Sequence, residues 1–284
     1  MTLLEALHFG RQRLRSAGVP DHEYDAGALL QYAADVSMAQ ILGDPGRELA
    51  PEALTRYLEM VGKREKRIPL QHIVGETCFY GYMFSTREGA LIPRSDTEHL
   101  VEQALMLAPE RPVRFLDLCT GTGCIGISFF LERRARGFRD EGILTDLSEA
   151  ALALAEENAE RLHAEVSLVH SDLFDGLKGE LFDIIMSNPP YISLSEMETL
   201  MPEVKDHDPR MALTDEGDGL LFYRRIAYEA EEHLKPGGQL FLEIGSGQRN
   251  AVEKLLSDKG FTDISCRQDY AGLDRVVYAK TRRI

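Results

Sequence analysis

Hydrophobic and polar positions alternate at helical spacing over residues 2–67. In "LLEALHFGRQRLRSAG", Leu3, Leu7 and Leu14 recur near one face, which is the spacing of an amphipathic helix. Shorter helical segments follow, each after a residue type that favours a helix start. Those residues are Asp21, Ser37 and Pro51. The pattern predicts a region of short helices, and no coenzyme motif occurs within it.

A different pattern begins after "RIPLQHIVGE". In "TCFYGYMFSTREGALIPRSDTE", apolar residues alternate around Gly81 and Gly89, which predicts a β-hairpin that bridges two domains. Ser95 and Glu98 have the S-x-x-E spacing of a capping box, in which each side chain accepts a hydrogen bond from the other residue's backbone N–H. We therefore expect Ser95 to cap the helix "DTEHLVEQALMLA".

From residue 113 onward, apolar strand-like runs alternate with helical segments. The predicted strands are "VRFLDL", "GILTD", "VSLVH", "FDIIMSN" and "GQLFLEI", with helices at 124–136, 148–162 and 218–234. Such alternation predicts a parallel sheet that helices cover on both faces. Two further strands, "FTDISCRQDY" and "DRVVYAK", surround the loop "AGL". A hairpin there would place one antiparallel strand in an otherwise parallel α/β sheet.

The composition is that of an ordinary globular protein. The 284 residues are 44% hydrophobic and 28% charged, enough for a main domain and a smaller one. We expect neither a signal peptide nor a membrane-spanning segment. The four cysteines show no C-x-x-C pairing and no zinc-like spacing with the histidines, so we predict no metal site and a reducing, cytoplasmic location. They are Cys78, Cys119, Cys124 and Cys266.

The net charge of −15 is unevenly distributed. Residues 1–90 contain 10 Lys and Arg against 12 Asp and Glu, whereas residues 91–284 contain 22 against 35. Proteins bind duplex DNA largely by neutralising its phosphates with a basic surface. The acidic second part of the chain therefore argues against a duplex DNA substrate.

A glycine-rich loop follows the first predicted strand of this second part. In "FLDLCTGTGCIG", Gly121, Gly123 and Gly126 match G-x-G-x-x-G, and Asp146 follows twenty residues later at the end of the next strand. This is the spacing of a dinucleotide fingerprint, with an acid for the ribose hydroxyls. By this pattern alone, a nicotinamide-dependent dehydrogenase is one candidate.

Two other features favour S-adenosylmethionine (AdoMet), a nucleoside that carries a sulfonium and an ammonium group but no phosphate. Asp117 precedes the glycines, where a carboxylate would repel pyrophosphate and attract a cation. The tetrad "NPPY", Asn188 to Tyr191, ends the fourth strand, on the rim where open α/β sheets bind ligands. Asp172 follows the third strand, and it would accept from the adenine amine or simply form a turn.

The tetrad also suits methyl transfer to a nitrogen. An amide nitrogen is a poor nucleophile because its lone pair is delocalised, so a site helps by holding its N–H groups and its lone-pair face in position. The Asn188 side-chain oxygen and the Pro189 carbonyl are candidate acceptors, and Tyr191 would stack on the flat amide. We assign no general base. His207 and Asp208 are expected on a surface loop.

With these motifs in order, the chain resembles the HemK/PrmC family of protein-(glutamine-N5) methyltransferases, which are class I AdoMet-dependent enzymes that modify peptide-chain release factors. The matching blocks are "RIPLQHIVGETCFYG", "GALIPRSDTEHLVE", "FLDLCTGTGCIGIS", "SNPPYIS", "DPRMALTDEGDGLLFYRRI", "LKPGGQLFLEIGSGQ" and "DRVVYAK". The chain departs from the family at Cys119, where glycine is usual, and at Ser95-Asp96, where the family has Pro-Glu.

The resemblance implies three parts: a helical substrate-binding domain at 1–72, a hairpin linker at 73–95 and a seven-stranded, Rossmann-like methyltransferase domain at 96–284. It also implies catalytic residues Asn188, Pro189 and Tyr191, which with Pro190 form the substrate site. The AdoMet-binding residues predicted from the motifs and the resemblance together are Asp117, Thr120, Gly121, Thr122, Gly123, Asp146, Asp172, Leu173 and Asn188.

The substrate implied by the resemblance is the glutamine of a Gly-Gly-Gln segment in class 1 release factors, methylated by a monomeric enzyme without a direct nucleic-acid substrate or membrane partner. Three alternatives stay open: a glutamine in a ribosomal protein, the N6 amine of adenine in nucleic acid, and a non-catalytic AdoMet sensor. The acidic charge argues against the nucleic acid, and the intact tetrad argues against the sensor.

Overall fold

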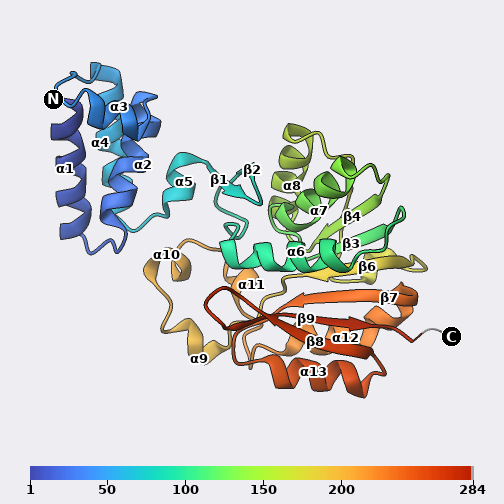
Figure 1. Cartoon of the computed structure of the whole chain (residues 1–284). Helices are drawn as coiled ribbons and strands as arrows, with labels where there is room; N and C mark the ends of the chain where they lie inside the picture. Colours follow the sequence, from blue (N-terminus) through green and yellow to red (C-terminus); the bar gives the residue numbers. More distant parts are fainter. Residues whose placement is uncertain (283–284) are drawn as a thin grey trace. The chain divides into compact units, whose positions relative to one another are not determined.

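The structure, a computed structural model, describes residues 1–282 and divides the chain into two compact units (Figure 1). One unit contains Met1–Glu76 together with Met201–His207. The other contains Thr77–Leu200 and Asp208–Ile284. No helix among the described residues is long and apolar enough to cross a membrane.

The first unit is helical, as predicted. Its helices are α1 (Leu3–Ser16), α2 (His22–Ala34), α3 (Met38–Gly43), α4 (Pro51–Glu65), α5 (Leu70–Val74) and α10 (Pro202–Lys205). Leu3, Leu7 and Leu14 are buried in its core, which confirms the predicted apolar face of α1. Ser37 caps α3 in a capping box with Gln40.

Pro51 occupies the start of α4, also as predicted. Asp21 precedes α2 but makes no side-chain capping bond.

A buried ion cluster ties a late segment of the chain to this helical unit. Glu203 accepts hydrogen bonds from Arg64 at 2.8 Å and from Arg67 at 2.6–2.7 Å, and Arg64 also binds Asp25 at 2.7 Å. Burial alone would raise the pKa of Glu203, but the two arginines hold it down at about 2. Residues 201–207 are thereby anchored, although they lie more than 120 positions after the end of α5.

A tight hairpin of β1 (Glu76–Phe79) and β2 (Tyr82–Ser85) follows. Tyr80 and Gly81 both have positive φ, at 51° and 81°, as a two-residue hairpin turn of the primed type requires. The hairpin around Gly81 is therefore confirmed, whereas Gly89 lies beyond both strands.

The predicted capping box at Ser95 is wrong. Residues Ser95–Thr97 form a 3₁₀ turn, η1, and α6 (Glu98–Leu107) follows without a side-chain cap. The Glu98 carboxylate instead accepts the backbone N–H of Tyr80 at 2.7 Å. It is unavailable for capping because it holds the hairpin turn.

The second unit is built on a seven-stranded sheet in the order β5-β4-β3-β6-β7-β9-β8. Its strands are β3 (Arg114–Leu118), β4 (Glu141–Asp146), β5 (Ser167–His170), β6 (Phe182–Ser187), β7 (Leu234–Glu243), β8 (Thr262–Gln268) and β9 (Asp274–Lys280). The first five are parallel, and β9 runs antiparallel to both β7 and β8. The predicted parallel sheet with an antiparallel strand is confirmed.

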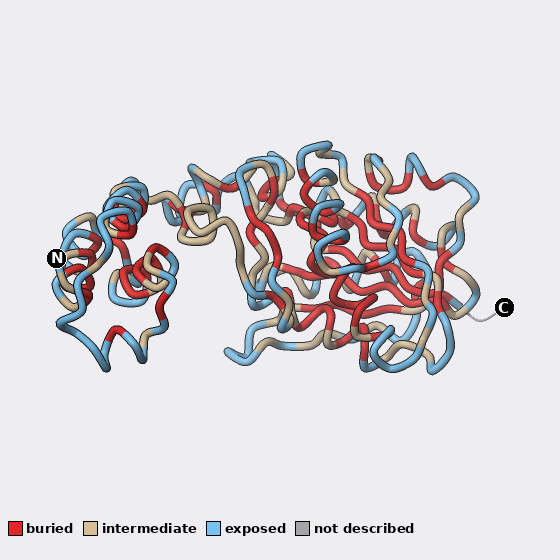
Figure 2. Tube along the Cα trace, turned by 90° about the horizontal axis from the view of Figure 1, so that it is seen from above, coloured by how far each residue is buried: buried red, intermediate tan, exposed pale blue. Residues whose placement is uncertain are grey.

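Helices cover both faces of this sheet (Figure 1). They are α6, α7 (Cys124–Ala135), α8 (Glu149–Arg161), α12 (Leu221–His233) and α13 (Arg249–Asp258). The unit also contains the short pieces η2 (Asp175–Leu177), α9 (Leu194–Met197) and α11 (Arg210–Leu213). Phe115 and Ile184 pack with α6 and α7 in one core, whereas their neighbours Leu116 and Ile185 pack with α12 in the other. Successive strand residues point to opposite faces, so both faces are apolar, and Figure 2 shows many buried residues in the middle of this unit.

The order of the strands creates a place for a ligand. From β3 the chain passes to β4 and β5 on one side, and then returns to β6 on the other side of β3. The carboxyl ends of β3 and β6 therefore lie at a topological switch point, where open α/β sheets bind ligands.

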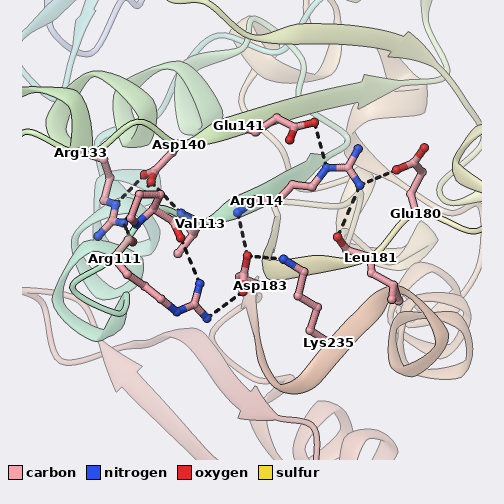
Figure 3. A network of polar contacts seen from close by, with 11 residues as sticks. Arg111, Val113, Arg114, Arg133, Asp140, Glu141, Glu180, Leu181, Asp183 and Lys235 are labelled. Atoms are coloured by element: carbon pink, nitrogen blue, oxygen red, sulfur yellow. Dashed lines mark hydrogen bonds and ion pairs between the residues drawn. The ribbon is translucent and has the colours of Figure 1, made fainter.

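The opposite rim, at the amino ends of β3 and β6, is closed by ion pairs (Figure 3). Asp183 of β6 accepts from the backbone N–H of Arg114, from Lys235 and from Arg111 at 2.8–2.9 Å. Burial would raise the pKa of Asp183, but these three donors lower it below its ordinary value.

Candidate functional site

The glycine loop turns sharply from β3 into α7. Cys119, Gly121 and Gly123 all have positive φ, between 57° and 81°. A Cβ on Gly126 would lie 2.9 Å from Leu144 and 3.0 Å from Asp117 Oδ2, so only glycine fits against β4 there. Cys119, where the family usually has glycine, adopts a left-handed conformation that costs a non-glycine residue on the order of 1 kcal/mol.

Asp117 organises this loop from within the protein. Its Oδ2 accepts from the Thr120 hydroxyl at 2.5 Å and from the Gly126 N–H at 2.9 Å. Its Oδ1 has no hydrogen-bond partner among the described residues. Full burial raises the pKa of Asp117 to about 7, against the lowering effect of its two donors, and nearby Asp146 adds to the rise.

Asp146 lies at the end of β4 and holds the loop from the other side. Its two oxygens accept from the backbone N–H groups of Gly121 at 2.9 Å and of Ser148 at 2.8 Å. Burial raises the pKa of Asp146 despite these bonds. The acid twenty residues after Gly126 therefore has a fixed orientation next to the glycines, as the fingerprint spacing predicts.

A cavity of about 680 Å³, counting its open mouth, lies at the carboxyl ends of the strands. The predicted site residues that line it are Gly121, Asp146, Asp172, Leu173, Asn188 and Pro190. The other predicted site residues do not line it; they are Asp117, Thr120, Thr122, Gly123, Pro189 and Tyr191.

Several lining residues were missed by the analysis of motifs. Gly89, Ala90 and Leu91 come from the segment after the hairpin, and Met211 and Phe222 come from beyond the tetrad. The matching blocks "GALIPRSDTEHLVE" and "DPRMALTDEGDGLLFYRRI" contain them, but only the folded chain shows that they line the same cavity as Gly121.

Asp172 forms an ion pair in addition to its place in a turn. Its Oδ1 binds Arg225 of α12 at 2.8 Å, and its neighbour Leu173 is buried in the core while it lines the cavity. The carboxylate therefore already has a cationic partner, and its place on the wall is set by α12.

The tetrad extends from the end of β6. The last strand residue, Ser187, donates its hydroxyl to the Leu118 carbonyl at 2.9 Å, which joins the ends of β6 and β3. Asn188 Nδ2 donates to Thr97 Oγ1 at 3.3 Å. The Tyr191 hydroxyl donates to Glu243 Oε1 at 3.2 Å, and burial followed by the charge of Glu243 raises the pKa of Tyr191.

Gln248 fixes the backbone behind the tetrad. Its Nε2 donates to the carbonyls of Tyr191 at 2.8 Å and Gly219 at 3.2 Å, and its Oε1 accepts from the N–H of Gly245 at 3.0 Å. A Cβ on Gly219 would lie 2.3 Å from the Tyr191 carbonyl. The block "LKPGGQLFLEIGSGQ" thus supports the tetrad through Gln248 and Glu243, neither of which sequence analysis assigned a role.

The expectation that Asp208 lies on a surface loop is wrong. Its side chain is buried and pairs with Arg94 at 2.5 Å. Arg94 belongs to the "LIPR" segment before α6, so this ion pair connects the loop after the tetrad to the segment whose Leu91 lines the cavity.

The chain matches two protein families. Residues 5–75 match the PrmC N-terminal domain, and residues 97–218 match the methyltransferase small domain.

Relatives named release factor glutamine methyltransferase align over nearly the whole chain. The one from Cereibacter sphaeroides is 42% identical and covers 99% of both chains. The relative from Geobacter sulfurreducens is 40% identical, and the alignment covers 97% of this chain and 95% of the relative. The relative from Caulobacter vibrioides is 38% identical, and the alignment covers 98% of this chain and 96% of the relative.

Solved structures of methyltransferases share the fold. A methyltransferase from Pyrococcus furiosus aligns with a TM-score of 0.53 at 17% identity, over 78% of this chain and 99% of its own. The T. Thermophilus 16S rRNA N2 G1207 methyltransferase aligns with a TM-score of 0.53 at 20% identity, over 73% of this chain and 50% of its own. At these identities the likeness shows the fold alone.

Proposed function

The chain belongs to the release factor glutamine methyltransferase family, and on that premise we propose that it transfers a methyl group from AdoMet to the side-chain N5 of glutamine in the Gly-Gly-Gln segment of a class 1 release factor. The observation that carries the proposal is the position of Asn188 and Pro190 on the wall of the same cavity that Gly121 and Asp146 line. In this proposal, the nucleoside-binding groups and the amide-binding tetrad share one site, which two of the four tetrad residues line.

The residues around the cavity fit AdoMet better than a dinucleotide. Asp146 offers a carboxylate to ribose hydroxyls, and Leu173, Met211 and Phe222 offer apolar surface to a nucleobase. No Lys or Arg is among the lining residues within the described chain, so a pyrophosphate would find no cationic partner there. AdoMet, when bound, supplies an electrophilic methyl group on a sulfonium.

The tetrad would position the glutamine amide. In this proposal, Asn188 Oδ1 and the Pro189 carbonyl accept the two N–H groups and hold the nitrogen toward the methyl group. Tyr191 provides a rigid flat surface, since its hydroxyl is held by Glu243 and its carbonyl by Gln248. Such positioning lowers a barrier by roughly 7–11 kcal/mol in favourable cases. We assign no general base, because an amide that has gained a methyl group on nitrogen loses its proton readily to water.

The helical unit is proposed to bind the protein substrate. Its exposed large side chains, including Tyr24, Tyr32 and Leu42, are of the kind that dominates protein–protein contacts. Tyr32→Ser should therefore raise KM for an intact release factor and leave KM for a short Gly-Gly-Gln peptide unchanged. If the variant affected both substrates equally, the helical unit would have no selective role in binding the protein.

We further propose that the enzyme acts as a monomer in the cytoplasm, where release factors act in translation.

The test is incubation with labelled AdoMet and purified candidate proteins, followed by peptide mapping. Label on the glutamine of Gly-Gly-Gln is expected. Label on a ribosomal-protein glutamine or on adenine would replace this proposal with one of those alternatives. Calorimetric titration with AdoMet and NAD provides an independent test, since tighter binding of NAD would exclude the methyltransferase assignment, and AdoMet binding without transfer to any candidate would favour a sensor.

A further inference from the structure

Glu243 is a buried acid that lies beside the tetrad. It ends β7, whose residue Leu242 pairs with Ser187 of β6, so Glu243 lies alongside the first residues after β6. Only 2% of its surface is exposed. Its Oε1 accepts from the Tyr191 hydroxyl at 3.2 Å, whereas its Oε2 has no hydrogen bond of normal geometry among the described residues.

Thr97 is a hydroxyl residue that interacts with Asn188 and influences this acid. Its Oγ1 accepts from Asn188 Nδ2 at 3.3 Å, and the residue is buried. Burial raises the pKa of Glu243 to about 7, and the Thr97 hydroxyl, as a hydrogen-bond partner of the carboxyl, is the largest influence that lowers it. The proposed arrangement turns the Thr97 proton toward the Glu243 carboxylate, whose Oε2 lacks a hydrogen bond of normal geometry among the described residues.

This arrangement determines which way the Asn188 carboxamide points. A hydroxyl has one proton, so Thr97, when it donates to Glu243, has only lone pairs left for Asn188. Asn188 must then direct its NH₂ group toward Thr97. Its Oδ1 is left for the cavity that Asn188 lines, which is the acceptor that a substrate amide requires.

We infer that Thr97 and Glu243 are positioning residues that orient the Asn188 side chain with its oxygen toward the substrate. The inference rests on the proposed function and adds two residues that do not touch the reacting atoms. The same carboxylate also holds Tyr191, so Glu243 connects both ends of the tetrad. Ionised Glu243 accepts from both hydroxyls, whereas protonated Glu243 must donate one hydrogen bond itself and competes with them.

Other groups around Glu243 affect its protonation. Arg275 lowers the pKa of Glu243 and Asp96 raises it. The titratable and charged groups that interact with it are Tyr191, Tyr223, Asp96, Arg275 and Cys124. Since Arg275 also pairs with Asp269 at 3.0 Å and with Asp96 at 3.3 Å, its charge is shared among several acids.

The test compares Thr97→Val, which removes the hydroxyl at nearly constant shape, with Thr97→Ser, which keeps it. Full-length variants are assayed by single-turnover methyl transfer to a purified release factor at saturating AdoMet, with AdoMet affinity measured separately by calorimetry. We expect the rate of Thr97→Val to fall roughly 10–100-fold, the range seen when a partner that orients a functional ligand is removed. Thr97→Ser should restore it, and AdoMet affinity should change little in either variant.

Glu243→Gln provides the second measurement, because Gln resembles the protonated acid. The wild-type rate should fall as the pH drops through the pKa of Glu243 near 7, whereas Glu243→Gln should show a low rate with little dependence on pH. If melting curves show that this variant does not fold, the Thr97 pair decides the question by itself.

Equal rates of methyl transfer for Thr97→Val and the wild type would overturn the inference. An equal fall in rate for Thr97→Val and Thr97→Ser would overturn it as well. Either result leaves the proposed function intact, provided that the wild type methylates its glutamine. A wild type that binds AdoMet but methylates no glutamine would overturn the proposed function and this inference together.

Discussion

The pKa values of buried acids are shifted in opposite directions at the two rims of the central sheet. At the amino ends of the strands, Asp183 is surrounded by Arg111, Lys235 and the backbone N–H of Arg114, and its pKa is lowered (Figure 3). At the carboxyl ends, burial raises the pKa of both Asp117 and Glu243 to about 7. The same strands β3, β6 and β7 supply residues to both rims.

The difference identifies the functional rim. An acid with matched donors lowers the free energy of the folded chain, whereas an acid held without a matching cation costs free energy and persists where function requires it. Asp183 joins three strands. Asp117 shapes the glycine loop, and Glu243 holds the tetrad, in each case by accepting hydrogen bonds from hydroxyl or backbone groups. Four experiments test this contrast.

The largest expected effect is on catalysis at the carboxyl rim. Asn188→Ala removes an acceptor whose bond to the substrate strengthens toward the transition state, so kcat should fall roughly 10²–10³-fold, as when one oxyanion-hole donor is lost. KM for AdoMet should change much less. Single-turnover assays on purified release factor measure this, and an unchanged rate would remove Asn188 from the catalytic step.

The corresponding change at the amino rim should affect stability instead. Asp183→Ala leaves the Arg114 N–H without its acceptor, and the loss of charged hydrogen bonds should lower the free energy of unfolding by roughly 1.5–3 kcal/mol. Urea denaturation measures the loss. Asp183→Asn is the matched control, because it keeps an acceptor for that N–H and should lose less. A fall in kcat of the folded enzyme would contradict the division between the rims.

The rims should also respond to pH in opposite directions. Asp117 keeps its proton more tightly in the folded chain than in the unfolded one, so it lowers stability as the pH rises from about 4 to about 7. The lowered pKa of Asp183 has the reverse effect: its contribution is present above about pH 4 and is lost as the pH falls through its folded pKa.

Asp117→Asn should therefore stabilise the cofactor-free protein at pH 8 by on the order of 1 kcal/mol, because Asn keeps an acceptor for Thr120 and Gly126 but carries no charge. Unfolding measured across the pH range checks this. The difference in unfolding free energy between the variant and the wild type should be larger at pH 8 than at pH 5. If it were the same at both pH values, ionising Asp117 would not destabilise the folded chain.

The smallest expected effect is on protons exchanged during binding. A cationic cofactor lowers the pKa of nearby acids, so AdoMet binding near pH 7 should release a fraction of a proton, on the order of one at most. Calorimetry in buffers of different ionisation enthalpy measures it. Identical heats in all buffers would show that Asp117, Asp146 and Glu243 do not change protonation on binding.

Local patterns determined much of this protein. Strand and helix alternation from residue 113 specified a parallel sheet with one antiparallel strand, because buried strands need apolar residues on both faces and crossover helices need a 3.6-residue period. The glycine spacing specified the loop, since positive φ and close approach to Leu144 exclude a side chain. These properties depend on residues that are close together in the chain, so the sequence alone is enough to predict them.

The tertiary structure alone decided which polar groups meet. Glu98 has the spacing of a capping residue but holds the hairpin turn at Tyr80, and Asp208 has a loop context but is buried against Arg94. Thr97 and Asn188 are 91 positions apart, and Glu243 lies on a third segment. A hydrogen bond depends on distance and direction in space, which the folding of the sheet sets, so no spacing along the chain could reveal that these three residues act together.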